Sequence, residues 1–239
     1  MKIALVGFGR MGQEVERQAL RLGHEISMRF ELGLELTEEV DLHDAQVLID
    51  FSTAAAVKST LSMAAQRSLP VVEGTTGWVP DLEAVRRIPG LTMIYSPNFS
   101  MGVYHFQQLV RMAGRLYGSA SVYDAYVHEW HHTGKADSPS GTAITLANAL
   151  LEEMPQKKEL LLQTAEHKIA PHALHVTSTR AGSIPGTHEI GFDSPYDQII
   201  LRHQAFGREA FAYGALMAAS WIIGRKGIFT MDDFMAEQS

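Results

Sequence analysis

The stretch KIALVGFGRMGQEVERQALRLGHEISMRF, residues 2–30, carries the clearest indication of the fold in this chain. It opens with the apolar run 2–6, which ends in glycine, a pattern typical of a buried parallel strand. Apolar residues then recur at helical spacing from Val15 to Leu22, and Gly23 ends that helix. The segment HEISMRF resumes as a strand. The stretch therefore predicts a strand–turn–helix–strand unit of a parallel sheet.

Three glycines, Gly7, Gly9 and Gly12, form the pattern G-x-G-x-x-G between the first strand and the helix. The first permits a tight turn, the second lets the backbone approach a pyrophosphate, and the third lets helix and strand pack closely. The helix N-terminus adds free N–H groups and a partial positive charge for the phosphates. The motif predicts dinucleotide binding in this position; the alternative is a glycine turn with a structural role alone.

The ribose of such a cofactor should meet an acidic residue about 20 residues further on, at the end of the second strand. Glu31 fits this position. A carboxylate there hydrogen-bonds ribose hydroxyls and repels a 2′-phosphate, which favours NADH over NADPH. Arg29 could offset this repulsion, or it could be a solvated charge at the strand end.

Strands and helices continue to alternate up to about residue 100. AQVLIDFS at 45–52 indicates a buried strand and AAVKSTLSMAAQRS a helix, while LPVVEGTTG and LTMIYSPNFS each contain a further strand. Such alternation is typical of an α/β fold with a doubly wound, Rossmann-like parallel sheet.

Strands follow strands in the second half of the chain. They are predicted at 121–132, 174–182, 188–195 and 197–205, and only a helix at about 141–154 clearly interrupts them. This order indicates a second, α+β domain with a mostly antiparallel sheet.

A strongly apolar helix is predicted at 209–224. We expect it to pack back on the first domain, which would make that domain discontinuous. The expected domains are 1–102 with 209–239, for dinucleotide binding, and 103–208, for substrate binding and oligomerisation.

Composition limits the classes of partner. The net charge of −7 over 239 residues argues against a nucleic-acid or membrane-surface binder. The chain has no cysteine, which excludes disulfides, thiolate metal sites and a cysteine nucleophile. No run approaches about 18 consecutive apolar residues, and the start MKIALVG lacks the features of a signal peptide. We therefore expect a cytoplasmic protein with no nucleic-acid or membrane partner.

The stretch EWHHTGKADSPSGTA, residues 129–143, gathers two histidines, a lysine and a helix start. Glu129 and His131 share one face of a strand, because alternate residues do so. The Thr-Gly pair that follows breaks the strand and leaves His132 in a loop. Ser140 is a good helix N-cap, since its hydroxyl can accept a bond from an early N–H group.

The helix start after Ser140 predicts an anion site. Gly141 and Thr142 lie in the first turn, where free N–H groups attract anions, and Lys135 would add positive charge. His131 or His132 could supply a proton, since an unperturbed imidazole titrates near neutral pH. Together they predict a pocket for a carboxylate-bearing substrate with an acid beside it.

The same stretch has three other interpretations. The histidines could be structural, and Lys135 could be a solvated surface residue. A zinc site could use His128, His131 and His132, but their spacing matches no standard zinc signature. We therefore expect no metal.

The stretch 129–143 resembles the signature of the dihydrodipicolinate reductase family, enzymes of lysine and diaminopimelate biosynthesis. GFGRMG, VLIDFS, EGTTG, SPNFSMGV, RAGSIPGTHEI and HQAFGREAFAYGALMAA resemble the family's other motifs, in its order, over nearly the whole chain. The family reduces a cyclic imine dicarboxylate, 4-hydroxy-tetrahydrodipicolinate, with NADH or NADPH. The resemblance implies this activity, and a homotetramer built through the second domain.

The resemblance also implies roles for individual residues. His131 would be the acid/base residue and His132 a substrate-binding neighbour. Lys135 would bind one substrate carboxylate and is an alternative proton donor, while Gly141 and Thr142 would bind the other carboxylate. The implied cofactor-binding residues are Gly7, Phe8, Gly9, Arg10, Met11, Gly12, Glu31, Phe51, Gly74, Thr75, Thr76, Ser96, Pro97, Asn98 and Phe99, the positions from Gly74 onward lying by the nicotinamide.

Two alternative functions remain at this point. Another amino-acid-type dehydrogenase, such as an aspartate dehydrogenase, would leave the anion site between Lys135 and Thr142 without its second carboxylate. A non-catalytic dinucleotide-binding regulator would be favoured by the loss of His131 or Lys135, and both residues are present.

Overall fold

The computed structural model describes residues 1–31, 36–37, 39–120, 122–162, 165 and 167–238. The chain divides into two compact units. The first unit comprises Met1–Met101 and Arg208–Ser239, and the second comprises Gly102–Gly207. No helix in the described part of the chain is long and apolar enough to cross a membrane.

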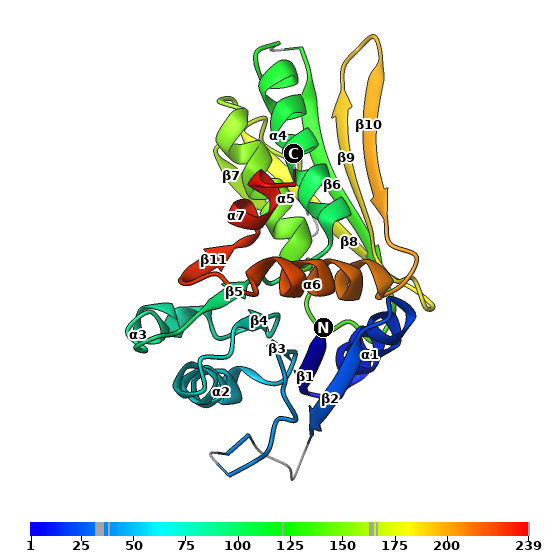
Figure 1. The fold of residues 1–239 in the computed structure, drawn as a ribbon. Helices are drawn as coiled ribbons and strands as arrows, with labels where there is room; N and C mark the ends of the chain where they lie inside the picture. The colour runs from blue at the N-terminus through cyan, green and yellow to red at the C-terminus, as the bar shows by residue number, and fades with distance from the viewer. Residues whose placement is uncertain (32–35, 38, 121, 163–164, 166, 239) are drawn as a thin grey trace. The chain divides into compact units, whose positions relative to one another are not determined.

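The first unit is built on a parallel sheet with the strand order β11-β5-β4-β3-β1-β2 (Figure 1). Residues on both faces of the central strands are buried, as expected where helices cover both sides of a sheet. The Rossmann-like, doubly wound sheet predicted from the sequence is therefore confirmed. The strands are β1 (Lys2–Val6), β2 (Glu25–Phe30), β3 (Val47–Asp50), β4 (Val71–Glu73), β5 (Met93–Tyr95) and β11 (Ile228–Thr230).

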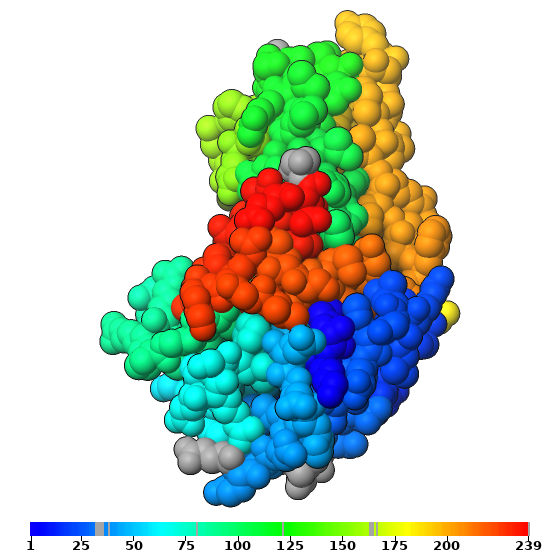
Figure 2. Space-filling model, viewed as in Figure 1, coloured from blue at the N-terminus to red at the C-terminus, as the bar shows by residue number. Residues whose placement is uncertain are grey.

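Helices pack on both faces of this sheet. On one face Val57 and Leu61 join a core with Ala4 and Leu48 of the strands. On the other face α1 and α6 lie side by side, and α6 packs on β3, β4 and β5. The C-terminal segment thus completes the unit that the N-terminal strand begins (Figure 2). The helices are α1 (Arg10–Arg21), α2 (Ala54–Gln66), the 3-10 turn η1 (Val79–Asp81), α3 (Leu82–Val85), α6 (Glu209–Ile222) and α7 (Met231–Ala236).

The strand order of the first unit changes direction at β1. β2 lies on one side of β1, whereas β3, β4 and β5 follow on the other. In open parallel sheets, ligands bind outside the carboxyl ends of the strands at such a switch point. The topology therefore directs attention to the loops that follow β1, β3 and β4.

The second unit has a mixed sheet in the order β10-β9-β6-β8-β7. The two longest ladders, β10–β9 and β6–β9, are antiparallel, so the sheet is mostly antiparallel by paired residues, as predicted. β6, β8 and β7 are parallel, because α5 (Gly141–Glu153) forms the crossover that a parallel connection needs. The strands are β6 (Asp124–His131), β7 (Glu159–Leu161), β8 (Ala173–Arg180), β9 (Thr187–Asp193) and β10 (Gln198–Gln204).

A long helix that the sequence analysis did not predict, α4 (Met101–Gly118), packs with α5 on one face of this sheet. Its buried stripe includes Phe106 and Val110. Leu109 and Leu116 are 53% and 64% exposed, so apolar residues occur around the helix and blur its amphipathic pattern. The strand predicted at 121–132 begins at Asp124; its first position, Ser121, lies outside the described residues.

Candidate active site

The glycine turn of the first unit has the geometry that a dinucleotide requires. Gly7 has φ +82°, and a Cβ atom there would lie 2.5 Å from the carbonyl oxygen of Phe51. A Cβ atom on Gly12 would lie 2.1 Å from the Gly7 oxygen, so glycine allows α1 to pack against β1. Gly9 is the N-cap of α1 and has open space around its Cα. A phosphate can therefore approach the backbone at the start of this helix.

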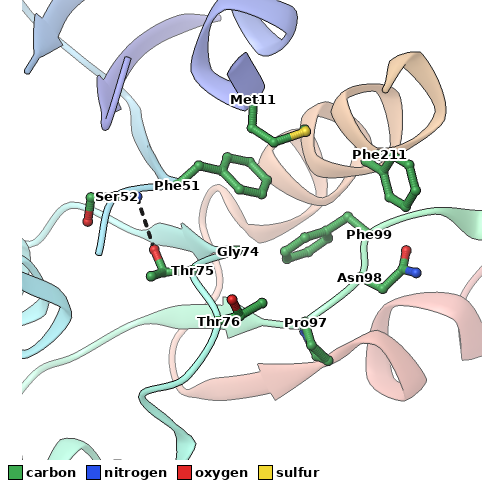
Figure 3. A pocket seen from close by; sticks show the side chains of 10 residues that line it. All are labelled: Met11, Phe51, Ser52, Gly74, Thr75, Thr76, Pro97, Asn98, Phe99 and Phe211. Atoms are coloured by element: carbon green, nitrogen blue, oxygen red, sulfur yellow. Dashed lines mark hydrogen bonds between the residues drawn. The ribbon is translucent and has the colours of Figure 1, made fainter. Parts of the chain in front are cut away.

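A pocket of about 290 Å³ lies at the carboxyl ends of β3, β4 and β5 (Figure 3). The ring of Phe51 meets that of Phe99 edge-on, with centroids 6.5 Å apart. A Cβ atom on Gly74 would lie 2.1 Å from the Phe51 ring, so only glycine leaves room here. The lining residues are Met11, Phe51, Ser52, Gly74, Thr75, Thr76, Pro97, Asn98, Phe99 and Phe211.

This pocket brings together most of the cofactor residues expected between Met11 and Phe99. Ser96 does not line it but shapes the loop: its hydroxyl donates to the Asn98 oxygen at 2.7 Å and accepts from the Asn98 N–H at 3.1 Å. Ligand pockets span about 300–1,000 Å³. The volume here suits one ring of a cofactor rather than a whole dinucleotide.

The residues expected near the adenine end are more exposed. Glu31 directly follows β2 and is exposed, as is Arg10 at the start of α1. Arg29 is neither free nor merely solvated: its Nε donates to Glu16 at 2.8 Å, and its guanidinium lies 5.7 Å from the centre of the Phe8 ring. The positive charge that could have offset Glu31 is therefore neutralised by Glu16.

In the second unit, Glu129 and His131 occupy the buried face of β6, as the alternation of the strand predicted. The Nδ1 atom of His131 lies 3.1 Å from Oε2 of Glu129. The other oxygen of Glu129 accepts hydrogen bonds, each 2.8 Å long, from the Ser140 N–H, the Ser178 hydroxyl and Arg180. The His131 imidazole is thus in contact with the fully buried carboxylate of Glu129.

The ionised form of Glu129 is stabilised by these contacts. Burial alone would raise the pKa of this carboxyl group. The hydrogen bonds from His131, Ser140 and Arg180 outweigh burial and hold the pKa of Glu129 well below its usual range. Arg180 also donates to the backbone oxygen of Asp137 at 2.6 Å, so it fixes the loop after β6.

A second histidine, His188, lies against the same cluster. Its Nε2 atom is 3.6 Å from Oε2 of Glu129 and 3.3 Å from the Ser140 hydroxyl. Burial, helped by the neighbouring charge of His131, lowers the pKa of His188 to about 4. His188 is therefore neutral at pH 7, and His131 is the histidine that lies closer to Oε2 of Glu129.

Ligand atoms of Glu129, His131 and His188 lie within 4.8 Å of one another, which is a geometry that could hold a metal ion. Arg180 contacts the same carboxylate, so a metal ion held there would lie beside a fixed positive charge. The zinc set considered from the sequence is not brought together. His128 points to the other face of the sheet, where it contacts Thr177.

Lys135 lies in the turn after β6, and its Nζ atom is 2.7 Å from Oδ1 of Asp137. Burial opposes ionisation of Asp137, but Lys135 and the backbone N–H of Gly141 lower its pKa. The chain's own carboxylate thus lies between Lys135 and the start of α5, where the sequence predicted an anion. The predicted N-cap is confirmed, because the Ser140 hydroxyl accepts from the Ala143 N–H at 3.2 Å.

Of the remaining predicted residues, His132 directly follows β6 and Thr142 lies in the first turn of α5; both are half-buried. Sequence reasoning missed Arg180 and His188 as members of the site. Both occur in the motif RAGSIPGTHEI, which was recognised without a role for either residue. Their strands, β8 and β9, flank β6, and this arrangement cannot be read from spacing along the chain.

The family models and the full-length relatives of this chain agree on one family. Residues 1–99 match the family model described as "Dihydrodipicolinate reductase, N-terminus", and residues 102–235 match "Dihydrodipicolinate reductase, C-terminus". A 4-hydroxy-tetrahydrodipicolinate reductase of Christiangramia forsetii is 36% identical over 99% of this chain and 98% of its own length. One of Archaeoglobus fulgidus is 35% identical over 98% and 100%.

A solved structure shares the fold. The dipicolinate-bound dihydrodipicolinate reductase from Paenisporosarcina sp. TG-14 superposes with a TM-score of 0.72. It covers 96% of this chain and 97% of its own, at 22% identity. The likeness supports the same pair of sheets, a parallel one and a mixed one.

Proposed function

Because the chain belongs to the dihydrodipicolinate reductase family, we propose that its two units divide the binding tasks of that reaction. The activity is the NAD(P)H-dependent reduction of 4-hydroxy-tetrahydrodipicolinate in lysine biosynthesis. The full-length relatives are all named for this activity, which argues against the two alternatives, an aspartate dehydrogenase and a non-catalytic regulator. The family predicted from the sequence is thereby confirmed.

The first unit binds the dinucleotide. The backbone around Gly9 at the start of α1 receives the pyrophosphate, with Gly7 and Gly12 providing the turn and the close packing. The pocket between Phe51 and Phe99 receives the nicotinamide ring and shields it from water. When bound, NAD(P)H supplies the hydride.

The second unit binds the cyclic imine dicarboxylate. Lys135 receives one substrate carboxylate, and the N–H groups of Gly141 and Thr142 receive the other, with His132 as a neighbouring contact. The ion pair between Asp137 and Lys135 shows that a carboxylate is stabilised at this position. The substrate carboxylate therefore competes with Asp137 for Lys135. His131 delivers the proton to the reduced ring, with Lys135 as the alternative donor.

The observation that carries this proposal is the buried pair of Glu129 and His131. The Glu129 carboxylate, 3.1 Å from Nδ1, holds the orientation of the His131 ring, as a proton donor requires. A metal-free mechanism, a homotetramer and a cytoplasmic location belong to the same proposal.

A turnover assay tests the function directly. The cyclic imine is unstable, so it is generated in place by the synthase of the preceding step, and oxidation of NADH or NADPH is followed by absorbance. Oxidation that depends on the synthase product supports the proposal. Without such oxidation by either cofactor, the assignment of this activity is wrong.

The cofactor preference depends on Glu31. We expect a lean toward NADH, because the Glu31 carboxylate repels a 2′-phosphate while Glu16 neutralises Arg29. Two unit charges about 4 Å apart in water interact by about 1 kcal/mol, so Glu31→Ala should raise the NADPH/NADH ratio of kcat/KM about fivefold. Glu25→Ala, an exposed glutamate at the other end of β2, is the matched control. An unchanged ratio in Glu31→Ala would show that Glu31 is not the ribose ligand.

The second unit is also expected to form a homotetramer. Tyr126, His128 and Trp130 lie on the face of β6 that points away from the core formed with α4 and α5, and they remain half-buried. An apolar sheet face of this kind is expected to be buried against another copy of the chain. Light scattering at micromolar concentration should give the mass of four chains, and Trp130→Glu should reduce it. A stable monomer of the parent chain would contradict this prediction.

A further inference from the structure

Two carboxyl groups are fully buried at the carboxyl ends of two central strands of the first unit's sheet, next to the pocket proposed for the nicotinamide. Asp50 is the last residue of β3 and Glu73 the last residue of β4, and each is 0% exposed. They are register partners in the parallel ladder, so their side chains project from the same face. Burying a carboxyl group costs free energy of folding unless its hydrogen bonds compensate. Two such groups side by side therefore indicate a specific role.

The hydrogen bonds of the pair run to the two loops that line the pocket. Asp50 Oδ1 accepts the Ser52 N–H at 2.8 Å and the Thr75 hydroxyl at 3.3 Å. Glu73 Oε1 accepts the Thr75 N–H at 2.7 Å. The Ser52 N–H also approaches the Thr75 hydroxyl at 3.1 Å (Figure 3). The carboxyls therefore tie the loop after β3 to the loop after β4.

Burial opposes two negative charges in this pair of carboxyl groups. Burial and the neighbouring charge of Asp50 raise the pKa of Glu73 to about 9. Burial also raises the pKa of Asp50, but hydrogen bonds from Ser52, Thr75 and Glu73 oppose that shift. No cation is among the principal causes of either shift. Glu73 is therefore the member of the pair that holds a proton at neutral pH, next to its register partner Asp50.

The other ionisable groups near β4 place no further charge beside Glu73. Tyr95 is the register partner of Glu73 on β5. On α6, which packs on β4, Glu209 is paired with Arg17 at 2.8 Å and Tyr213 is 45% exposed. Lys58 of α2 is exposed. Asp50 is therefore the one charged group in direct contact with Glu73 among these.

We propose that Glu73 is a positioning residue of the cofactor site: together with Asp50 and Thr75, it holds the Phe51–Ser52 and Gly74–Thr76 loops in the shape that receives the nicotinamide. The inference rests on the proposed function for the identity of the ring in the pocket. Loss of the Glu73 proton puts two carboxylates side by side, which repel each other and separate the loops.

The first test compares NADH binding by fluorescence between pH 6 and pH 10 in the parent chain and in Glu73→Gln. Glutamine can donate to Asp50 and accept from the Thr75 N–H, but it does not ionise. The parent should bind NADH about tenfold more weakly at pH 10 than at pH 8, as expected for a group titrating near pH 9. Glu73→Gln should match the parent at pH 7 within about twofold and lose this alkaline decline.

The second test removes the hydrogen bonds as well. Glu73→Leu should weaken NADH binding about tenfold at pH 7, since a buried Thr75 N–H and the Asp50 carboxylate lose their partner. Glu83→Gln, an exposed glutamate of α3, is the control and should behave as the parent does. Binding of pyridine-2,6-dicarboxylate, an activity-independent probe of the second unit, should be unchanged in all variants. If Glu73→Leu does not fold, the pH profiles of the parent and Glu73→Gln still decide.

Melting temperature gives an independent readout. The folded chain holds a proton on Glu73 that the unfolded chain loses above about pH 4.5, so stability should fall as pH rises from there to about 9. Glu73→Gln should flatten this fall. The proposal is overturned if Glu73→Gln keeps the parent's alkaline decline, if the parent shows none, or if Glu73→Gln binds as weakly as Glu73→Leu. None of these outcomes depends on turnover of the cyclic imine, so failure of the proposed function is seen separately.

Discussion

Replacement of His131 by glutamine should lower turnover by about 10²–10⁴-fold, the usual contribution of a positioned acid or base. Glutamine keeps a polar side chain near Glu129 but cannot deliver a proton to the ring. Substrate affinity should change much less, because the proposed carboxylate contacts at Lys135 and the start of α5 are unaltered. The measurement is kcat and KM with the coupled synthase, together with the Kd for pyridine-2,6-dicarboxylate.

Two further variants sharpen this experiment. Glu129→Gln keeps the shape of the side chain but removes the negative charge 3.1 Å from His131, so it should also lower kcat. His172→Gln changes an exposed histidine that pairs with Glu159 in the same unit, and it should retain full activity. Near-full turnover by His131→Gln would mean that Lys135, His132 or a water molecule is the acid.

Replacement of Lys135 by alanine should weaken substrate binding by about 1.5–3 kcal/mol, the value of a hydrogen bond to a charged group. This corresponds to an increase in KM and in the Kd for pyridine-2,6-dicarboxylate of about 10–150-fold. Turnover should fall as well if the ammonium group is the proton donor. The variant also frees Asp137, whose charge then repels the incoming carboxylate and adds to the loss.

Lys158→Ala, an exposed lysine of the same unit, is the matched control for the lost charge. NADH binding should be unchanged in the His131 and Lys135 variants, because the glycine turn and the pocket proposed for the nicotinamide belong to the first unit. Unweakened binding of pyridine-2,6-dicarboxylate by Lys135→Ala would refute the assignment of this lysine to a carboxylate.

Local patterns were sufficient for much of this protein. The run 2–6, the glycine turn and the helical spacing from Val15 to Leu22 predicted β1, the turn and α1, because each depends on neighbours within a few residues. The N-cap at Ser140 and the shared face of Glu129 and His131 could be predicted for the same reason. α4 was missed where exposed apolar residues hid its periodicity.

The family, its reaction and the residues that carry its motifs were thus determined by the sequence alone. Three contacts between distant or loop residues could be recognised in the three-dimensional structure alone. Arg180 and His188 complete the Glu129 cluster, Glu16 neutralises Arg29, and Asp137 pairs with Lys135. The structure alone placed Asp50 beside Glu73. The physical reason is that these contacts depend on strand order and register, which sum many weak packing interactions across the chain, whereas turns, caps and periodicity are set by adjacent residues.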